Sequence, residues 1–217
     1  MKGVSFKKKE KLSDRTGGVT IMQTATKKET VLGIRQMAMI GVMTAVTCIA
    51  APFSIPIPVS PVPLSLTTFI LYLSVYILGT RNAFISYVIY LLLGLVGLPV
   101  FSGGSAGAAK LFGPTGGYLV GYLFLALIAG AFVGRYTENK WKSIAFAALG
   151  MVLGTMVLYA LGTAWLAYSA GMDFQAALWA GVIPFIPGDL VKMVIAVLLG
   201  SAVRGRLLRA GILEGNN

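Results

Sequence analysis

Long apolar stretches alternate with short polar, glycine-rich or proline-rich connections from residue 34 onward. A helix needs about 20 mostly apolar residues to cross a bilayer. The pattern predicts six membrane-spanning helices, at residues 34–53, 64–79, 83–98, 116–134, 141–168 and 188–203. The second and third stretches are short for a full span, which local thinning of the bilayer would accommodate.

The distribution of basic residues gives these helices an orientation, because cytoplasmic flanks carry an excess of Lys and Arg. With the N-terminus in the cytoplasm, 16 of the 18 basic residues fall on the inner side. The inner groups are nine residues within 1–35, Arg81, three residues within 135–142 and three within 204–209. Lys110 lies in an outer loop and Lys192 in the sixth stretch. We therefore expect both ends of the chain in the cytoplasm.

Composition supports the membrane assignment. Hydrophobic residues make up 57% of the chain and charged residues 12%, whereas soluble domains carry about 25% charged residues. We expect an all-α integral membrane protein with glycine-rich outer loops. Its parts are a basic cytoplasmic tail at residues 1–33, a six-helix substrate-binding domain at 34–205 and a cytoplasmic tail at 206–217. The basic tail lacks the apolar region of a secretory signal, and its place beside a membrane span explains its charge without nucleic acid.

The residue types also restrict the possible chemistry. The chain contains no His and one Cys, Cys48. Ser–His–Asp catalysis and HExxH metal sites are therefore excluded, as is an internal disulfide, and a zinc or haem site is not expected. The chain also has no GxxxxGK[ST] phosphate-binding motif. We expect no cofactor, no metal and no enzymatic activity, and ATP hydrolysis would have to come from separate proteins.

Glycines recur at four-residue intervals, at Gly117 and Gly121 and again at Gly150 and Gly154. Small residues at this spacing allow helices to approach closely in lipid, so most of them are expected to pack the bundle. Gly41 and Ala45 form a similar pair on the first helix. That pair is a candidate face for docking a partner protein.

Three features meet on the predicted outer side: a proline-rich connection at residues 54–63, a glycine-rich stretch at 101–118, and the pair Asp189 and Lys192. The three-residue spacing puts both charges on one helix face. In one interpretation Asp189 caps the helix and Lys192 extends to the interface, so that the pair is structural. In the other, the carboxylate accepts and the ammonium donates hydrogen bonds to a small polar ligand.

At these residues the sequence resembles the BioY family, the biotin-binding S components of energy-coupling factor transporters. The matching stretches are IPIPVSPVPLSLTT, LLLGLVGLPVFSGG, GPTGGYLVGYL and FIPGDLVK, in this order within residues 35–205. The resemblance implies a six-helix protein of the cell membrane that captures biotin through Asp189 and Lys192. It also implies a partner module of one transmembrane coupling protein and two ATP-binding-cassette ATPases. The family's AxxxA-like docking face corresponds here to Gly41 and Ala45, which is not a strict match.

Biotin's ureido group has two N–H donors and a carbonyl acceptor, which suit Asp189 and Lys192. The candidates for contact with biotin's apolar ring and chain are aromatic: Phe101, Tyr118 and Tyr122. The candidates for binding its carboxylate are the ammonium group of Lys110 and the backbone N–H groups of Gly116 and Gly117. Two alternatives remain open: an S component for another vitamin, and an ion-coupled carrier that titrates Asp189.

Overall fold

A computed structural model describes residues 33–58, 60–133 and 140–210 and is mostly helical, as predicted. Its elements are α1 (Ile34–Ala50), β1 (Ser54–Ile55), β2 (Leu64–Ser65), α2 (Thr67–Val96), a 3-10 turn (Ser102–Gly104), α3 (Ala108–Phe112), α4 (Gly116–Val133), α5 (Lys140–Ala170), α6 (Phe174–Gly181) and α7 (Ile186–Arg209). By length and composition, four of the described helices, α2, α4, α5 and α7, can cross a membrane, and α1 is a shorter apolar helix. The count of six spans stays a prediction.

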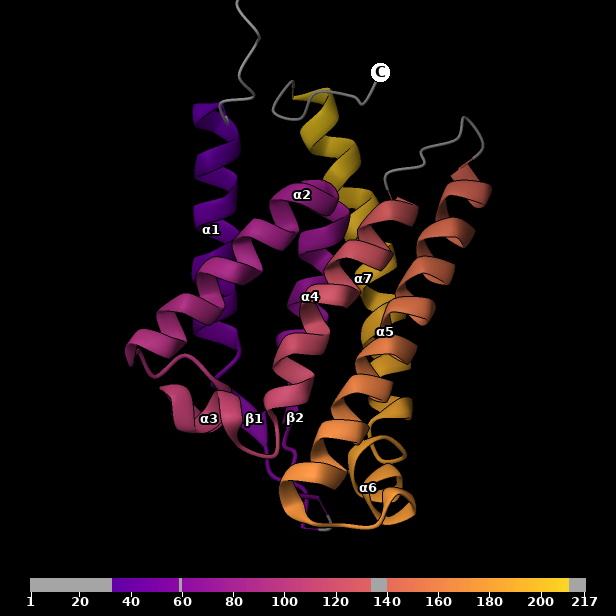
Figure 1. The fold of residues 1–217 in the computed structure, drawn as a ribbon. Helices are drawn as coiled ribbons and strands as arrows, with labels where there is room; N and C mark the ends of the chain where they lie inside the picture. Colours follow the sequence, from indigo (N-terminus) through magenta and orange to yellow (C-terminus); the bar gives the residue numbers. More distant parts are fainter. Residues whose placement is uncertain (1–32, 59, 134–139, 211–217) are drawn as a thin grey trace, which may run out of the picture. The chain divides into compact units, whose positions relative to one another are not determined.

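Helix α2 contains both of the short stretches that the sequence pattern separates. Its 30 residues are interrupted at Gly79, whose φ of 75° and ψ of 178° are not helical. Figure 1 shows one limb of α2 rising from β2 and the other descending toward α3. The connection expected between the stretches at 64–79 and 83–98, which contains Arg81, is thus only a break at a single glycine, a residue that tolerates positive φ.

The break leaves carbonyl groups of the first limb without their helical donors. Arg204 of α7 supplies a donor to one of these carbonyl groups, since its Nη1 donates a hydrogen bond to the Tyr76 carbonyl oxygen at 3.0 Å. Gly200, one turn earlier on α7, lies directly against the Tyr76 side chain. The first limb is therefore held to α7. The second limb is held to α1, where the Thr44 and Ser86 hydroxyls are 2.9 Å apart.

Glycines bring α4 and α5 into close contact, as their spacing predicts. A Cβ atom at Gly117 would lie 2.3 Å from Cβ of Trp165, and one at Gly121 would lie 3.2 Å from Cα of Leu158. Gly154 of α5 has the same relation to Leu125 of α4. A side chain at Gly117 would require the helices to separate, and one at Gly121 or Gly154 would require its neighbours to shift. This close packing fixes the faces of α4 and α5 that carry the tyrosines of the candidate site.

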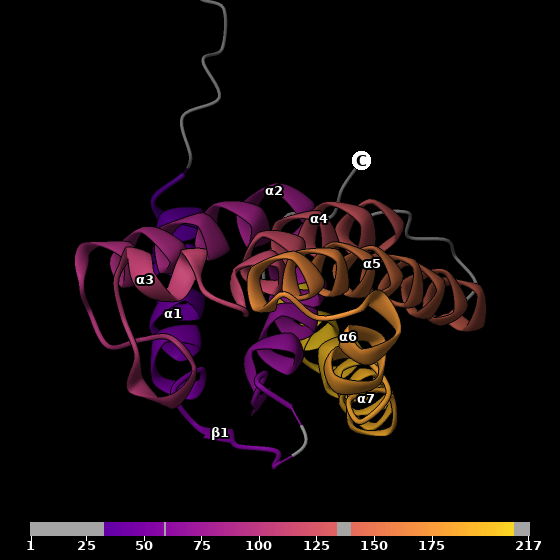
Figure 2. The ribbon, with the colours of Figure 1, turned by 60° about the horizontal axis from the view of Figure 1, so that its bottom comes forward.

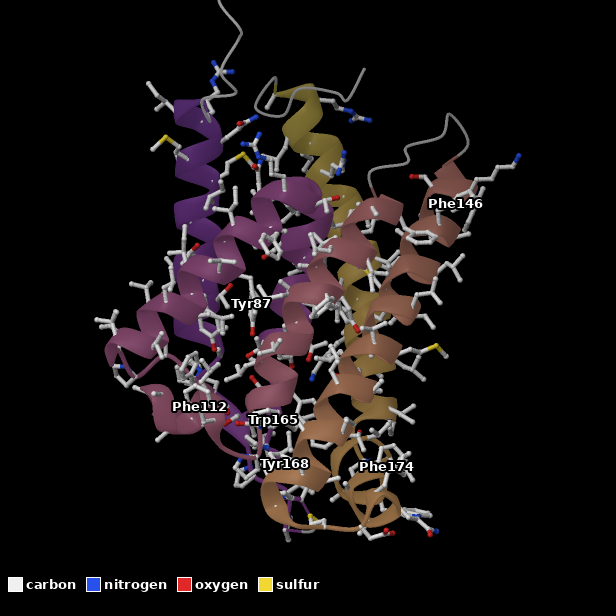
Figure 3. All side chains as sticks on the ribbon, in the orientation of Figure 1. Tyr87, Phe112, Phe146, Trp165, Tyr168 and Phe174 are labelled. Atoms are coloured by element: carbon white, nitrogen blue, oxygen red, sulfur yellow. The ribbon has the colours of Figure 1, made fainter. Side chains whose placement is uncertain are left out.

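The connecting elements gather at one end of the described helices. Strands β1 and β2 pair antiparallel, with Ser54 opposite Ser65, and so flank the proline-rich connection. Figures 1 and 2 show α3 on the side of α1 and α2, and α6 beside α5 and α7. In Figure 3, Phe112, Trp165, Tyr168 and Phe174 lie at this same end. Aromatic side chains of this kind are enriched at membrane–water interfaces.

The opposite end carries most of the described basic residues. Helix α7 continues to Arg209, beyond the predicted end near residue 203, and its last turn contains Arg206 and Arg209. Cations there interact favourably with the partial negative charge at a helix C-terminus. The starts of α1 and α5 lie at this end in Figure 1, with Arg35 and Lys142 in their first turns.

Candidate ligand-binding site

A small cavity lies next to the paired strands and is lined by both charged residues of the predicted pair. Its wall includes the chain just before α2, the first turn of α2, and parts of α4, α5 and α7. The polar groups on this wall come from Ser65, Thr68, Tyr118, Tyr122, Tyr159, Asp189 and Lys192. Four segments that are distant in sequence thus contribute to one small compartment.

Asp189 and Lys192 form the ion pair that their spacing predicts. Lys192 Nζ lies 2.9 Å from Asp189 Oδ1, and the side chains are only 13% and 7% exposed for Lys192 and Asp189, respectively. Asp189 lies in the first turn of α7, where the helix dipole favours a negative charge. The pairing in the structural interpretation is therefore confirmed. Lys192 does not extend toward the interface, since its ammonium group binds inside the protein.

Two further groups complete the environment of the pair. The Tyr159 hydroxyl donates to Asp189 Oδ2 at 2.7 Å, and Lys192 donates to the Ser65 carbonyl oxygen at 2.8 Å. A lone charge at the centre of a membrane helix costs about 2.5 to 3.5 kcal/mol on insertion scales. Pairing and hydrogen bonding offset that cost, while loss of one partner would leave the other charge uncompensated.

The two predicted tyrosines of α4 also line the cavity. Tyr118 and Tyr122 are four residues apart and therefore share a helix face. The Tyr118 hydroxyl donates to the Gly181 carbonyl oxygen at 2.8 Å, and the Tyr122 hydroxyl lies 2.8 Å from the Thr68 hydroxyl. With their hydroxyls engaged, the rings are held as walls of the cavity.

The other predicted site residues lie outside this cavity. Phe101 is fully buried and packs edge-on against Tyr90, with ring centroids 5.6 Å apart. Gly116 and Gly117 face Trp165 of α5. Lys110 lies in α3, where partial burial lowers the pKa of its ammonium group. Contacts of these four residues with a ligand stay predictions.

The predicted docking residues Gly41 and Ala45 are exposed on α1. A Cβ atom at Gly41 would meet nothing within 4 Å. The open space around Gly41 differs from the surroundings of Gly117, where Trp165 leaves no room for a side chain. Gly41 is therefore not needed for packing within the described residues, and its role in docking stays a prediction.

Sequence reasoning did not identify Tyr159, Thr68 or the Ser65 carbonyl group. Tyr159 lies 30 residues before Asp189 on a different helix, and no spacing rule connects them. The one available signal was a tyrosine within an apolar stretch, which is common in helix packing.

No cluster of three or more His, Cys, Asp or Glu residues suited to a metal ion occurs in the part of the chain that the structure describes.

The fold and the site define a helical membrane protein with a cavity lined by a paired carboxylate and ammonium group. The sequence profile of the BioY family matches residues 22–209. The chain therefore belongs to the BioY family.

Individual relatives agree with this assignment. The chain is 39% identical over 166 residues to a protein of Thermotoga maritima named biotin transporter BioY, which covers 76% of this chain and 94% of the relative. It is 36% identical over 171 residues to a probable biotin transporter BioY of Pyrococcus horikoshii, covering 79% and 97%. The crystal structure of the S-component for biotin from an ECF-type ABC transporter superposes with a TM-score of 0.71 at 29% identity, covering 79% of this chain and 92% of that one.

The hydrogen bond from Tyr159 to Asp189 generates a prediction about stability. Tyr159→Phe removes only the hydroxyl donor, and a hydrogen bond to a charged group contributes about 1.5 to 3 kcal/mol. We expect the free energy of unfolding to fall by roughly that amount in detergent-based denaturation. Tyr168→Phe is the matched control, since Tyr168 lies on the same helix and is 83% exposed. Equal stability of the two variants would contradict the structural role of this bond.

Proposed function

We propose that this chain captures biotin from outside the cell with high affinity and mediates its uptake as the S component of an ECF-type ABC transporter. The observation that carries the proposal is the Asp189–Lys192 pair on the wall of a small cavity, in a chain of the BioY family. The chain is a transport protein and not an enzyme, consistent with relatives that are named as transporters.

The donors and acceptors of the cavity match the ureido group of biotin. Asp189 accepts hydrogen bonds from the ureido N–H groups, and Lys192 donates to the ureido carbonyl. Both residues already have protein partners, Tyr159 and the Ser65 carbonyl, that keep them oriented. The rings of Tyr118 and Tyr122 provide apolar surface beside the ion pair for the bicyclic part of the ligand.

The proposed partners are a transmembrane coupling protein and two ATP-binding-cassette ATPases. The chain lacks a phosphate-binding loop motif of its own, so the energy for uptake comes from such a module. The exposed side of α1, which includes Gly41 and Ala45, is the proposed docking face.

We further propose a multi-pass orientation in the cell membrane with both chain ends in the cytoplasm. The support is the separation of charges, with basic residues near the starts of α1 and α5 and the end of α7. Lys110, in α3, is the one basic residue described in the loops at the opposite end. The ligand cavity, beside β2 and the start of α7, then opens on the outer half of the membrane.

Equilibrium binding of labelled biotin to the purified chain tests the function. Asp189→Asn keeps the size of the side chain but removes its charge, so affinity should fall by roughly tenfold to over a hundredfold. The double variant Asp189→Asn with Lys192→Met removes both charges, so neither is left buried without a partner. This variant should fold but fail to bind biotin. Asp173→Asn is the control, because Asp173 is exposed and caps α6. Normal biotin affinity in the folded double variant would defeat the site assignment, and preference for another vitamin would defeat the choice of ligand.

Docking can be tested separately from ligand binding. Gly41→Leu places a large side chain on the exposed face of α1, so we expect weaker co-purification with the coupling protein and unchanged biotin affinity. Gly205→Leu is a suitable control, since Gly205 also has nothing within 4 Å of an added Cβ atom but lies on α7. Lost biotin binding with intact assembly would instead place Gly41 in the ligand-binding bundle.

Orientation can be tested with single cysteines after Cys48→Ser removes the native thiol. A cysteine at Ser105, in the loop before α3, should react with an impermeant maleimide added from outside. A cysteine at Lys142, in the first turn of α5, should react only once the membrane is opened. The reverse pattern would overturn the proposed orientation.

A further inference from the structure

A second cavity, an open cleft, lies between α5 and α7 and shares two wall residues with the ligand cavity. The shared residues are Tyr159 and Asp189. The rest of the wall consists of Val152, Thr155 and Met156 from α5 and Ile186, Leu190 and Met193 from α7. A single hydrogen-bonded pair of side chains therefore borders both compartments.

The surface of the cleft is almost entirely apolar. Its polar side chains already have partners: Thr155 donates to the Met151 carbonyl oxygen at 2.7 Å, and Tyr159 donates to Asp189. The rim is exposed, with 62% of Met156 and 52% of Leu190 accessible. The cleft is thus an open groove that presents methyl and methylene groups.

The surroundings determine what fits such a groove. Both α5 and α7 are long and apolar enough to cross a membrane, so their exposed sides face hydrocarbon. An apolar cleft does not hold water well, and unfilled space there would forfeit dispersion contacts. The seven-residue rise from Val152 to Tyr159 spans roughly 10 Å along the helix, which suits a segment of a hydrocarbon chain.

We propose that an acyl chain of a membrane phospholipid binds between α5 and α7 and forms the bilayer-side wall of the ligand site. The chain keeps water away from Asp189 on that side, and a low local dielectric strengthens the hydrogen bonds of the carboxylate. Its effect on biotin rests on the proposed function, whereas lipid binding itself does not. The lipid therefore acts as a structural part of the ligand site.

Native mass spectrometry of the purified chain tests the lipid site directly. Met156→Trp places an indole in the cleft from its exposed rim and should remove one tightly retained phospholipid relative to the wild type. Leu190→Trp should do the same from the opposite helix. Leu153→Trp is the matched control: Leu153 is on α5, is 37% exposed and is not part of the cleft wall. Equal lipid retention in all three variants would show ordinary surrounding lipid only and overturn the site.

Biotin affinity measured before and after delipidation tests the coupling. Removing lipid with detergent should weaken binding by about tenfold in the wild type, and adding dioleoylphosphatidylglycerol should restore it. Met156→Trp should bind equally with and without lipid, because the indole replaces the chain. Unchanged wild-type affinity after delipidation would overturn the coupling. Absence of biotin binding in every condition would count against the proposed function. The mass-spectrometric measurement of lipid retention would still show whether the cleft binds a lipid.

Discussion

The ion pair between Asp189 and Lys192 is the constraint on which the arrangement of the site depends. Two opposite charges can remain inside an apolar bundle only when each has close partners. Lys192 meets this requirement through the backbone at Ser65, next to the proline-rich connection, and Asp189 meets it through Tyr159 of α5. The pair thereby ties α7 to two segments that are otherwise distant in sequence. Stability and the proposed recognition of the ligand therefore depend on the same few atoms.

Close helix packing makes this convergence possible. Because Gly117, Gly121 and Gly154 carry no side chains, α4 and α5 approach until backbone and side-chain atoms are in direct contact. Dispersion contacts and not a hydrophobic driving force hold helices together in lipid. The same approach places Tyr118 and Tyr122 of α4 and Tyr159 of α5 on the wall of one cavity. The glycine pattern therefore determines the helix packing on which the geometry of the site depends.

Sequence periodicity was sufficient for the apolar helices, the close glycine contacts and the Asp189–Lys192 pair, because all three follow from local spacing. It was insufficient for Tyr159 and the Ser65 carbonyl group, whose roles arise only when separate segments meet. It also missed the break at Gly79 within α2 and the short helix α6. Phe101, Lys110, Gly116 and Gly117 do not line the cavity, and their contacts with a ligand stay predictions. Neighbouring residues on a helix can have different partners, as Gly117 and Tyr118 do.

The break at Gly79 has a mechanical meaning. The first limb of α2 is bonded to α7, which carries the ion pair, and the second limb is bonded to α1, which carries the proposed docking face. Between the limbs stands one residue with a positive φ that a side chain would strain. Movement of α1 with its limb can therefore be absorbed as rotation about two backbone angles before it reaches α7. A side chain at position 79 would be strained at this positive φ and would restrict rotation between the two limbs, and so between the proposed docking face and the proposed ligand site.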